Sequence, residues 1–298
     1  MKITRRELLT GAAAAGIGGS LPRGGPGPAW AQTTQKRELV TAQGGDVSKF
    51  DPHFSTNSNE IRVSFNLFDN LTSRHPDGKL YPGLATEWKL QNQTVWTFKL
   101  RQGVKFHNGD PFTSADAKWS IERTYDPAAK TMVATALTTI DYIEAPDPYT
   151  LVVHTKKPDP LLAARLAFYG GQIVPRKYVE SVGNEAFNAR PVGTGPVRFV
   201  SWVKDDRAIF DANPDYWGGR IEVDRWVMRP IPETAPRVAA LLKGEVDIVT
   251  QLPPDQADRV NANGATRVTG ALYAALYVLG VNSKRPPLDN PLVKQALS

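Results

Sequence analysis

The sequence predicts a mixed protein of α-helices and β-strands, α/β or α+β in class, arranged in two lobes. Its 298 residues are 41% hydrophobic, which is enough to bury a core, and at about 150 residues per domain the length suggests two domains. Short runs of β-branched and aromatic residues alternate with short helical patterns along the chain. The 24 glycines and 24 prolines place many residues in turns, which excludes long helical bundles and coiled coils.

Strands are predicted where apolar and polar residues alternate or where β-branched and aromatic residues cluster. The segment ELVTA at 38–42 alternates and then meets QGGD at 43–46, which predicts a strand that ends in an exposed turn. The run TVWTFKL at 94–100 predicts another strand, because its side chains suit a half-buried sheet. Further strands are predicted at residues 150–154, 197–202, 246–250 and 272–281.

Two helices are predicted from the signals at their ends. Thr113 or Ser114 caps the first helix, which ends at the Asp-Pro pair 126–127 because proline cannot continue a helix. Thr234 caps the second helix, and Gly244 supplies its left-handed stop.

A third helix is predicted close to the end of the chain. The triplet DNP at 289–291 is a favourable helix start, and residues 292–297 begin an apolar face. The chain stops at Ser298 without a capping glycine or a charged last turn. We therefore expect these 298 residues to be a truncated piece of a longer protein.

Residues 1–31 have the composition of an export signal. The paired arginines at 5–6, followed by two leucines, resemble the twin-arginine signal, and the Gly/Ala-rich run after them is weakly apolar. Ala-Trp-Ala at 29–31 offers small residues to a signal peptidase. An ordinary secretory signal with two chance arginines is the alternative. Since no cysteine is present, we expect an exported protein without a bacterial lipid anchor.

Charge and cysteine content exclude several classes of protein. The net charge is +6, of which +3 lies in residues 1–31, so the remainder carries only +3 and has no basic patch suited to nucleic acid. The absence of cysteine excludes a disulfide framework, a thiolate zinc site, an iron–sulfur cluster and a cysteine nucleophile.

The residues that carry most enzyme chemistry form no recognisable motif. The four histidines stand far apart, without a His-x-x-x-His pair, so neither a metal site nor a cofactor is predicted. Gly-Thr-Gly at 193–195 lacks the third glycine of a dinucleotide loop, and no Gly-x-Ser-x-Gly elbow or Walker A loop occurs. A glycosidase-type carboxylate pair stays open as an alternative, among Asp46, Asp51, Asp69 and Glu87.

Three stretches share an order and spacing that identify a family. The first joins FDNLT at 68–72 to DGKLYPGLATEW at 77–88, and the second is WTFKLRQGVKFHNGDPFT at 96–113. The third joins PVGTGP at 191–196 to NPDYW at 213–217. Together they resemble the family 5 extracellular solute-binding proteins, the dipeptide, oligopeptide and nickel-binding group that feeds ABC importers.

The resemblance implies a fold and a domain plan. The fold is of the periplasmic binding protein-like class II, cluster C, with a discontinuous lobe I, an inserted domain II and a mostly missing lobe III. The implied parts are a signal peptide at 1–31, lobe I at 32–56 and 189–275, domain II at 57–188, and the start of lobe III at 276–298.

The resemblance also implies where a ligand lies. In similar proteins the loop after the first strand contacts the ligand, and its glycines expose main-chain N–H and C=O groups. Asp46 is predicted to pair with a cationic ligand amine, with a plain turn capped by Asp46 as the alternative. The predicted ligand-binding residues are Gln43, Gly44, Gly45, Asp46, Thr250, Gln251, Tyr273, Tyr277 and Asn282.

We therefore predict a non-enzymatic, periplasmic substrate-binding subunit of an ABC importer, which captures a peptide or another small solute by closure of its lobes. The predicted partners are this ligand and the membrane permease subunits, without nucleic acid, and the predicted state is a monomer. The identity of the ligand does not follow from the sequence. An exported hydrolase with a carboxylate pair and a degenerate fragment that binds no ligand are the alternatives.

Overall fold

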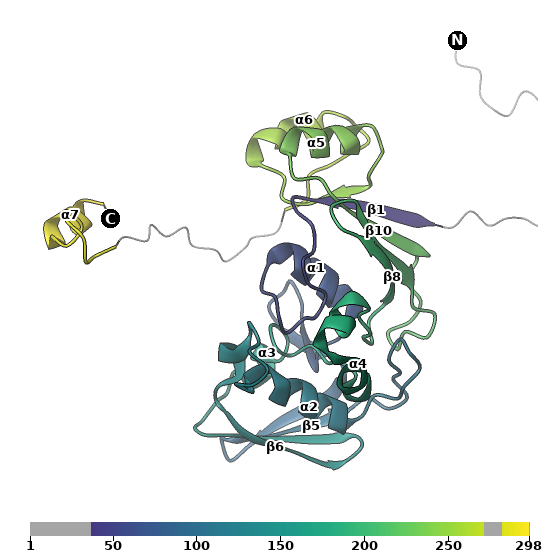
Figure 1. The fold of residues 1–298 in the computed structure, drawn as a ribbon, viewed down its shortest axis with the longest axis vertical. Helices are drawn as coiled ribbons and strands as arrows, with labels where there is room; N and C mark the ends of the chain where they lie inside the picture. The colour runs from purple at the N-terminus through teal and green to yellow at the C-terminus, as the bar shows by residue number, and fades with distance from the viewer. Residues whose placement is uncertain (1–36, 271–281, 298) are drawn as a thin grey trace, which may run out of the picture. The chain divides into compact units, whose positions relative to one another are not determined.

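The computed structural model describes residues 37–270 and 282–297, and within them the strands form three sheets (Figure 1). The largest sheet has five strands in the order β11, β1, β10, β9, β8. A second sheet has four strands in the order β4, β5, β7, β6, and a small third sheet pairs β2 with β3. Helices accompany both larger sheets, so the predicted mixture of α-helices and β-strands is confirmed.

The five-stranded sheet joins distant parts of the chain. β1 (Glu38–Gln43) pairs in parallel with β10 (Arg225–Pro230) and with β11 (Ile248–Val249). β10 pairs antiparallel with β9 (Arg207–Ala212), which pairs antiparallel with β8 (Val197–Val203). Figure 1 shows the consequence, because the purple strand β1 lies beside the green strand β10.

Both faces of this sheet bury apolar side chains. Ala42 of β1 packs with Val238 and Leu241 of α5 (Thr234–Leu242) in one cluster. Met228 of β10 alternates to the other face and joins a second cluster. A fully buried side chain of this size contributes about 1.5–3 kcal/mol, so apolar burial on both faces holds β1 in place between its neighbours.

The four-stranded sheet is antiparallel throughout. Its strands are β4 (Ala85–Gln91), β5 (Val95–Leu100), β7 (Thr150–Thr155) and β6 (Ile140–Asp147). The helix α2 (Ser114–Tyr125) lies along this sheet in contact with β6 and β7 (Figure 1).

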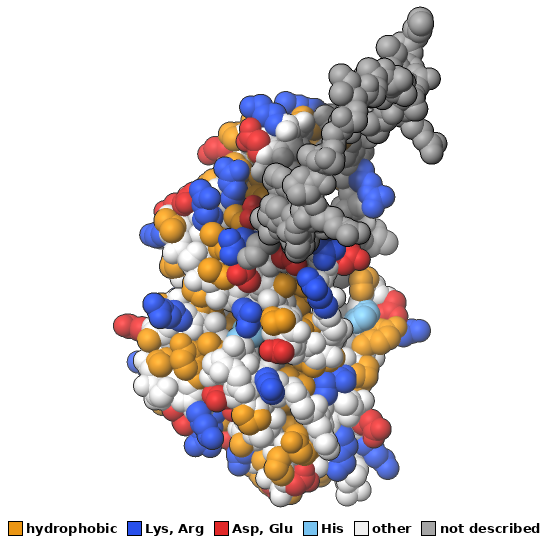
Figure 2. Space-filling view, turned by 90° about the vertical axis from the view of Figure 1, so that its right-hand side faces the viewer, with side chains coloured by type: hydrophobic (Ala, Val, Ile, Leu, Met, Phe, Trp, Pro, Cys, Tyr) orange, Lys and Arg blue, Asp and Glu red, His pale blue; other side chains and the backbone are white. Residues whose placement is uncertain are grey.

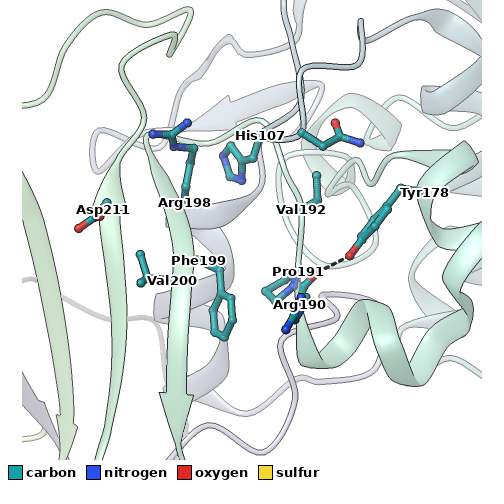
Figure 3. Close-up of a pocket in the computed structure, with 10 residues that line it drawn as sticks. His107, Tyr178, Arg190, Pro191, Val192, Arg198, Phe199, Val200 and Asp211 are labelled. Carbon is teal, nitrogen blue, oxygen red and sulfur yellow. Dashed lines mark hydrogen bonds between the residues drawn. The ribbon is translucent and has the colours of Figure 1, made fainter.

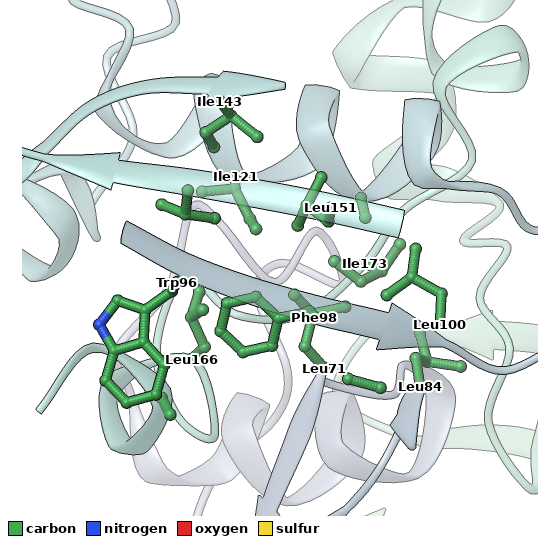
Figure 4. Packing of buried hydrophobic residues seen from close by; sticks show 14 of the residues in the cluster. Leu71, Leu84, Trp96, Phe98, Leu100, Ile121, Ile143, Leu151, Leu166 and Ile173 are labelled. Atoms are coloured by element: carbon green, nitrogen blue, oxygen red, sulfur yellow. The ribbon is translucent and has the colours of Figure 1, made fainter. Parts of the chain in front are cut away.

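The core between α2 and the four-stranded sheet follows the alternation of the strands. Phe98 and Trp96 of β5 point to the same side as Leu151 of β7, and Ile121 of α2 meets them (Figure 4). Successive strand residues point to opposite faces, so every second residue of TVWTFKL enters this core. The alternation seen in the sequence is therefore the cause of the buried face.

Apart from α4 and α1, the remaining helices and strands are short. The helix α4 (Arg176–Ala189) is interrupted at Gly183, whose φ of 81° is the left-handed conformation that glycine accepts. The others are α1 (Ser58–Leu67), β2 (Thr72–Arg74), β3 (Leu80–Pro82), the 3₁₀ helices η1 (Ala134–Leu137) and η2 (Pro254–Gln256), α3 (Leu162–Arg165), α6 (Ala257–Asn261) and α7 (Pro291–Ala296).

Most predicted elements are confirmed, and two are corrected. Thr113 is the N-cap of α2, where Asp116 completes a capping box, and Asp126 is its C-cap. Thr234 is not the cap of α5, because the helix begins at Thr234 itself and Glu233 holds the cap position. The strand predicted at 246–250 shrinks to the two residues of β11, because only these pair with β1.

The end of the described chain agrees with the predicted helix start. Asn290 accepts a hydrogen bond from the N–H of Leu292 at 2.9 Å, and Leu292 is 72% exposed. The strand predicted at 272–281 falls on residues 271–281, which lie outside the described residues. Among the described residues, no helix combines the length and the apolar composition that crossing a membrane requires.

Candidate functional site

The three parallel strands of the larger sheet end at one edge. The register pairs Gln43 with Pro230 and Ala42 with Val249, so the loops after β1, β10 and β11 start side by side. We call these loops, residues 43–48, 231–233 and 250–253, the strand edge. Ligands of open α/β sheets bind outside the carboxyl ends of parallel strands, which makes the strand edge the candidate site.

Two predicted ligand-binding segments meet at the strand edge. The main-chain N–H of Gly44 donates to Oε1 of Gln251 at 3.1 Å, and the N–H of Thr250 donates to the carbonyl of Ala42 at 3.0 Å. A Cβ on Gly44 would lie 2.6 Å from Oε1 of Gln251, so a larger residue at this position would displace the side chain of Gln251. The structure therefore brings Gly44, Thr250 and Gln251 together, while their contact with a ligand stays a prediction.

Arg237 of α5 holds two of the loops and was missed by the sequence analysis. Its guanidinium Nη1 donates to the carbonyls of Ile231 at 2.7 Å and Pro232 at 2.9 Å, and Nη2 donates to the carbonyl of Gln251 at 3.1 Å. Arg237 is only 4% exposed, and no carboxylate within the described residues forms an ion pair with it. Carbonyl dipoles thus take the place of a counter-ion. No local sequence signal marks this residue.

Gln43 and Gly45 connect the strand edge to α1. Gln43 is 3% exposed, and its Nε2 donates to the carbonyls of Gly45 at 3.1 Å and Asn59 at 3.5 Å. A Cβ on Gly45 would lie 2.7 Å from Nδ2 of Asn59. The buried amide of Gln43 therefore shapes the loop from within, and the glycine lets the loop approach the first turn of α1.

The carboxylate of Asp46 is hydrogen-bonded to other groups of the protein. Its carboxylate accepts hydrogen bonds from the N–H of Val47 at 2.7 Å, from Nε1 of Trp202 at 3.2 Å and from the N–H of Asp205 at 2.7 Å. These contacts join the loop to the β8–β9 hairpin. They match the predicted alternative of a capped turn, so pairing of Asp46 with a ligand amine stays a prediction without support from its contacts.

The other predicted site residues have different surroundings. The hydroxyl of Thr250 is buried and has no hydrogen-bond partner among the residues that the structure describes. Asn282 is exposed, and its side chain accepts a local hydrogen bond from the N–H of Lys284 at 3.1 Å. Tyr273 and Tyr277 lie outside the described residues.

A second polar cluster joins motifs that are far apart in the sequence. Asp69 accepts hydrogen bonds from Nε1 of Trp217 at 2.8 Å, Oγ1 of Thr194 at 2.8 Å and the hydroxyl of Tyr216 at 3.2 Å. Burial raises the pKa of Asp69, although these hydrogen bonds and the charge of Arg101 act against the rise. We call Asp69, Thr194, Tyr216 and Trp217 the junction. Its members come from the motifs FDNLT, PVGTGP and NPDYW.

His107 binds the same PVGTGP turn beside the junction. Its Nδ1 accepts from the N–H of Gly193 at 3.1 Å, so the ring proton is on Nε2, which donates to the carbonyl of Gly195 at 3.0 Å. Burial lowers the pKa of His107 to about 4, so the ring is neutral at pH 7. Both ring nitrogens are occupied, which makes His107 a structural residue.

The carboxylates suggested for a hydrolase do not form a pair. Asp51 is buried and pairs with Arg123 at 2.6 Å, and Arg123 also donates to Nδ1 of His53 at 3.0 Å. Burial lowers the pKa of His53 to about 4. Asp46, Asp51 and Asp69 thus sit in three separate hydrogen-bond networks, and Glu87 is exposed on β4. Within the described residues, no group of three His, Asp or Glu side chains is arranged to hold a metal ion.

A hollow of about 620 Å³ lies away from the strand edge, between β8 and the segment 190–192. In Figure 3, His107 lies between Arg198 and Val192, and the hydroxyl of Tyr178 donates to the main chain of Arg190 at 3.2 Å.

On the face in Figure 2, side chains of Lys and Arg are interspersed with those of Asp and Glu. That face therefore carries no extended region of a single charge.

Comparison with known proteins identifies the family. The model of the family described as "Bacterial extracellular solute-binding proteins, family 5 Middle" matches residues 79–298. The periplasmic oligopeptide-binding protein OppA of Haemophilus influenzae is 29% identical over 91% of this chain and 54% of its own length. The glutathione-binding protein GsiB of Pectobacterium atrosepticum is 28% identical over 100% of this chain and 56% of its own. The chain spans about half the length of these curated relatives.

Solved structures show the same fold. The binding protein MoaA of A. tumefaciens R10, in complex with mannopinic acid, superposes with a TM-score of 0.82 at 29% identity over 88% of this chain and 55% of MoaA. The Haemophilus influenzae OppA complex with the peptide RPPGFSPFR has a TM-score of 0.74 at 26% identity over 88% of this chain and 55% of OppA. Over the shared part, the chain has the mixed α/β fold of periplasmic binding proteins.

Proposed function

Since the chain belongs to the bacterial extracellular solute-binding proteins of family 5, we propose that it captures a peptide or a related small solute for an ABC importer. The family is one of binding proteins, in agreement with the prediction that the chain is not an enzyme. Relatives described as binding oligopeptides and glutathione support this solute class. The partner that receives the solute is the membrane permease of the importer.

The proposed location is the periplasm, with residues 1–31 as a twin-arginine signal. We retain the predicted domain plan, in which lobe I combines 32–56 with 189–275, domain II covers 57–188, and lobe III begins at 276. The five-stranded sheet supports this plan, because β1 pairs with strands from the second half of the chain. The four-stranded sheet is built entirely from residues 85–155, within domain II.

One observation carries the proposed binding site: the strand edge combines glycine loops with a rigid support. Gly44 and Gly45 have no side chains to keep a ligand from their main chain, and Arg237 fixes the neighbouring loops. A loop fixed before the ligand arrives loses little conformational entropy on binding. The strand edge is therefore the wall of lobe I that the ligand contacts.

Binding on this wall becomes tight when lobe III closes over the ligand. Closure buries the solute between two walls and excludes water, which strengthens polar contacts to it. The closed form is then the form that the permease recognises. The process needs no catalytic residue, because ligand binding only shifts the populations of open and closed protein.

The test uses the full-length protein and a panel of peptides, opines, sugars and nickel complexes. Trp202 reports on the site, because its indole donates to Asp46 in the loop after β1. A true ligand should raise the melting temperature and change the tryptophan emission. Trp202→Phe should lose most of the emission change and keep the rise in melting temperature.

A matched control is Trp88→Phe, in β4 of the other sheet. This variant should keep both responses. If no member of the panel changes either the melting temperature or the emission of the wild-type protein, the proposed function is wrong.

A further inference from the structure

The charges around the loop after β1, where it meets α1, favour an anionic ligand group, opposite to the amine predicted from Asp46. Two carboxylates lie close to the loop, and protein donors occupy both. Asp46 accepts from Val47, Trp202 and Asp205, and Glu60, which is buried, accepts from the N–H and the hydroxyl of Ser48. Their negative charges are already stabilised by these donors, so a ligand amine gains little from either.

Arg62 of α1 carries a positive charge that no ion pair offsets within the described residues. Its Nη1 donates to Oδ1 of Asn59 at 3.1 Å, and no carboxylate in the described ranges forms an ion pair with it. Arg62 is partly buried, and this burial lowers the pKa of its guanidinium. A partly desolvated guanidinium bonded to a neutral amide lacks the counter-charge that such groups usually have.

Asn59 connects this cation to the candidate site. The Nδ2 atom of Asn59 lies 2.7 Å from the position of a Cβ on Gly45, while its Oδ1 accepts from Arg62. The guanidinium is therefore one amide group away from the main chain of the loop after β1. Among the described residues the guanidinium makes a single hydrogen bond, from Nη1, which leaves Nη2 and Nε of Arg62 available for a ligand.

We propose that Arg62 is the specificity residue of this wall and binds a carboxylate group of the solute, with Asn59 as the residue that positions it. The inference rests on the proposed function and names its substrate class: solutes that present a carboxylate to the strand edge, as acidic opines and peptide C-termini do. The planar guanidinium offers two parallel N–H donors, which match the two oxygens of a carboxylate.

The test takes each ligand that the panel identifies and compares its binding with that of a neutral analogue. For a peptide acid, the neutral analogue is its C-terminal amide. Calorimetric titration of the full-length protein should show the acid binding about 10- to 100-fold tighter, as expected for a hydrogen bond to a charged group. Arg62→Met should lose this difference by weakening the acid alone, and Arg62→Lys should keep part of it.

Asn59→Asp is the sharpest companion variant. It preserves the shape of Asn59 but adds a carboxylate that pairs with Arg62 and competes with the ligand, so it should weaken the acid and leave the amide unchanged. Arg190→Met, which removes an arginine from the separate hollow, is the matched control and should bind like wild type.

The outcomes separate the two proposals. If the wild-type protein binds acid and amide equally, or if Arg62→Met weakens both equally, the assignment of Arg62 is wrong while the proposed function stands. If no solute binds the wild-type protein, the proposed function fails and the assignment falls with it.

Discussion

The junction and the strand edge are both built from glycine-containing loops with polar side chains. They differ in whether their polar groups have hydrogen-bond partners within the protein. At the junction, Asp69 receives three donors. Within the described residues, the buried hydroxyl of Thr250 at the strand edge has no hydrogen-bond partner, and the guanidinium of Arg62 in the neighbouring α1 has only an amide. A network with internal partners stabilises a fold, whereas unpaired groups are free to recognise a ligand. The comparison therefore separates a structural centre from the proposed binding surface.

The largest effect is expected from Gly193→Ala at the turn that the junction holds. The added Cβ would lie 2.0 Å from the carbonyl oxygen of Leu67, a backbone atom that cannot move away. We expect a loss of about 4 kcal/mol or more in the free energy of unfolding, or failure to fold. Urea denaturation followed by circular dichroism measures it. A stability equal to wild type would contradict the structural role of this turn.

A pH effect is expected from His107 beside the junction and from His53. Burial lowers the pKa of both from 6.5 to about 4, so the unfolded chain binds the extra protons as the pH falls. Their stabilisation is complete above about pH 6.5 and is lost down to about pH 4, with a slope of up to about 1.4 kcal/mol per pH unit for each histidine. The raised pKa of Asp69 acts in the opposite direction and offsets part of the loss.

Urea denaturation at several pH values between 7 and 4 measures this slope. His107→Asn should remove the contribution of one histidine to the slope of stability against pH. Gln251→Ala at the strand edge should keep the wild-type slope. Equal slopes in wild type and His107→Asn would show that this residue is not buried in its neutral form.

Asp69→Ala tests the centre of the junction. It leaves the indole of Trp217, the hydroxyl of Thr194 and the hydroxyl of Tyr216 without their acceptor. We expect the free energy of unfolding to fall by about 3 kcal/mol, because three donors, one buried and two partly buried, keep their desolvation cost without an acceptor. Chemical denaturation measures the change, and Glu87→Ala, on the exposed face of β4, is the control with little effect.

The smallest change in stability is expected from Gly44→Ala at the strand edge. Its Cβ would meet Oε1 of Gln251 at 2.6 Å, but that atom ends a flexible side chain and can rotate away. We expect a loss below about 1 kcal/mol in stability and a clear loss of ligand affinity, because the loop surface changes. Denaturation and calorimetric titration give the two values. A large loss of stability here would remove the difference between the two regions.

The motifs that identify the family are mostly not the residues of the candidate site. Asp69, Thr194 and Trp217 lie in conspicuous stretches because turns, aromatic residues and close packing require particular residue types. Arg62 and Arg237 are ordinary helix residues in the sequence, and only their partners reveal their roles. The glycine loop after β1 was therefore predictable from the sequence, whereas the roles of Arg62 and Arg237 beside it were not.

The sequence by itself determined the local structure of this protein and its family. Alternating apolar residues defined β1 and β5, the capping signals of Thr113 and Asp116 defined α2, and Gly244 defined the end of α5. These signals act within a few residues, so they can be read without the fold.

Only the tertiary structure decided which of these segments meet. The hydrogen bond between Gly44 and Gln251 spans 207 residues, and Glu38 of β1 pairs with Arg225 of β10, which is 187 residues further along the chain. It also decided that Trp202 donates to Asp46 and that, in the described part of the chain, Arg62 forms no ion pair. Local patterns do not specify long-range partners, because these depend on how the whole chain packs its apolar faces. The hydrogen-bond partners of Asp46 and Arg62 therefore decide which of their charges is left to attract a ligand.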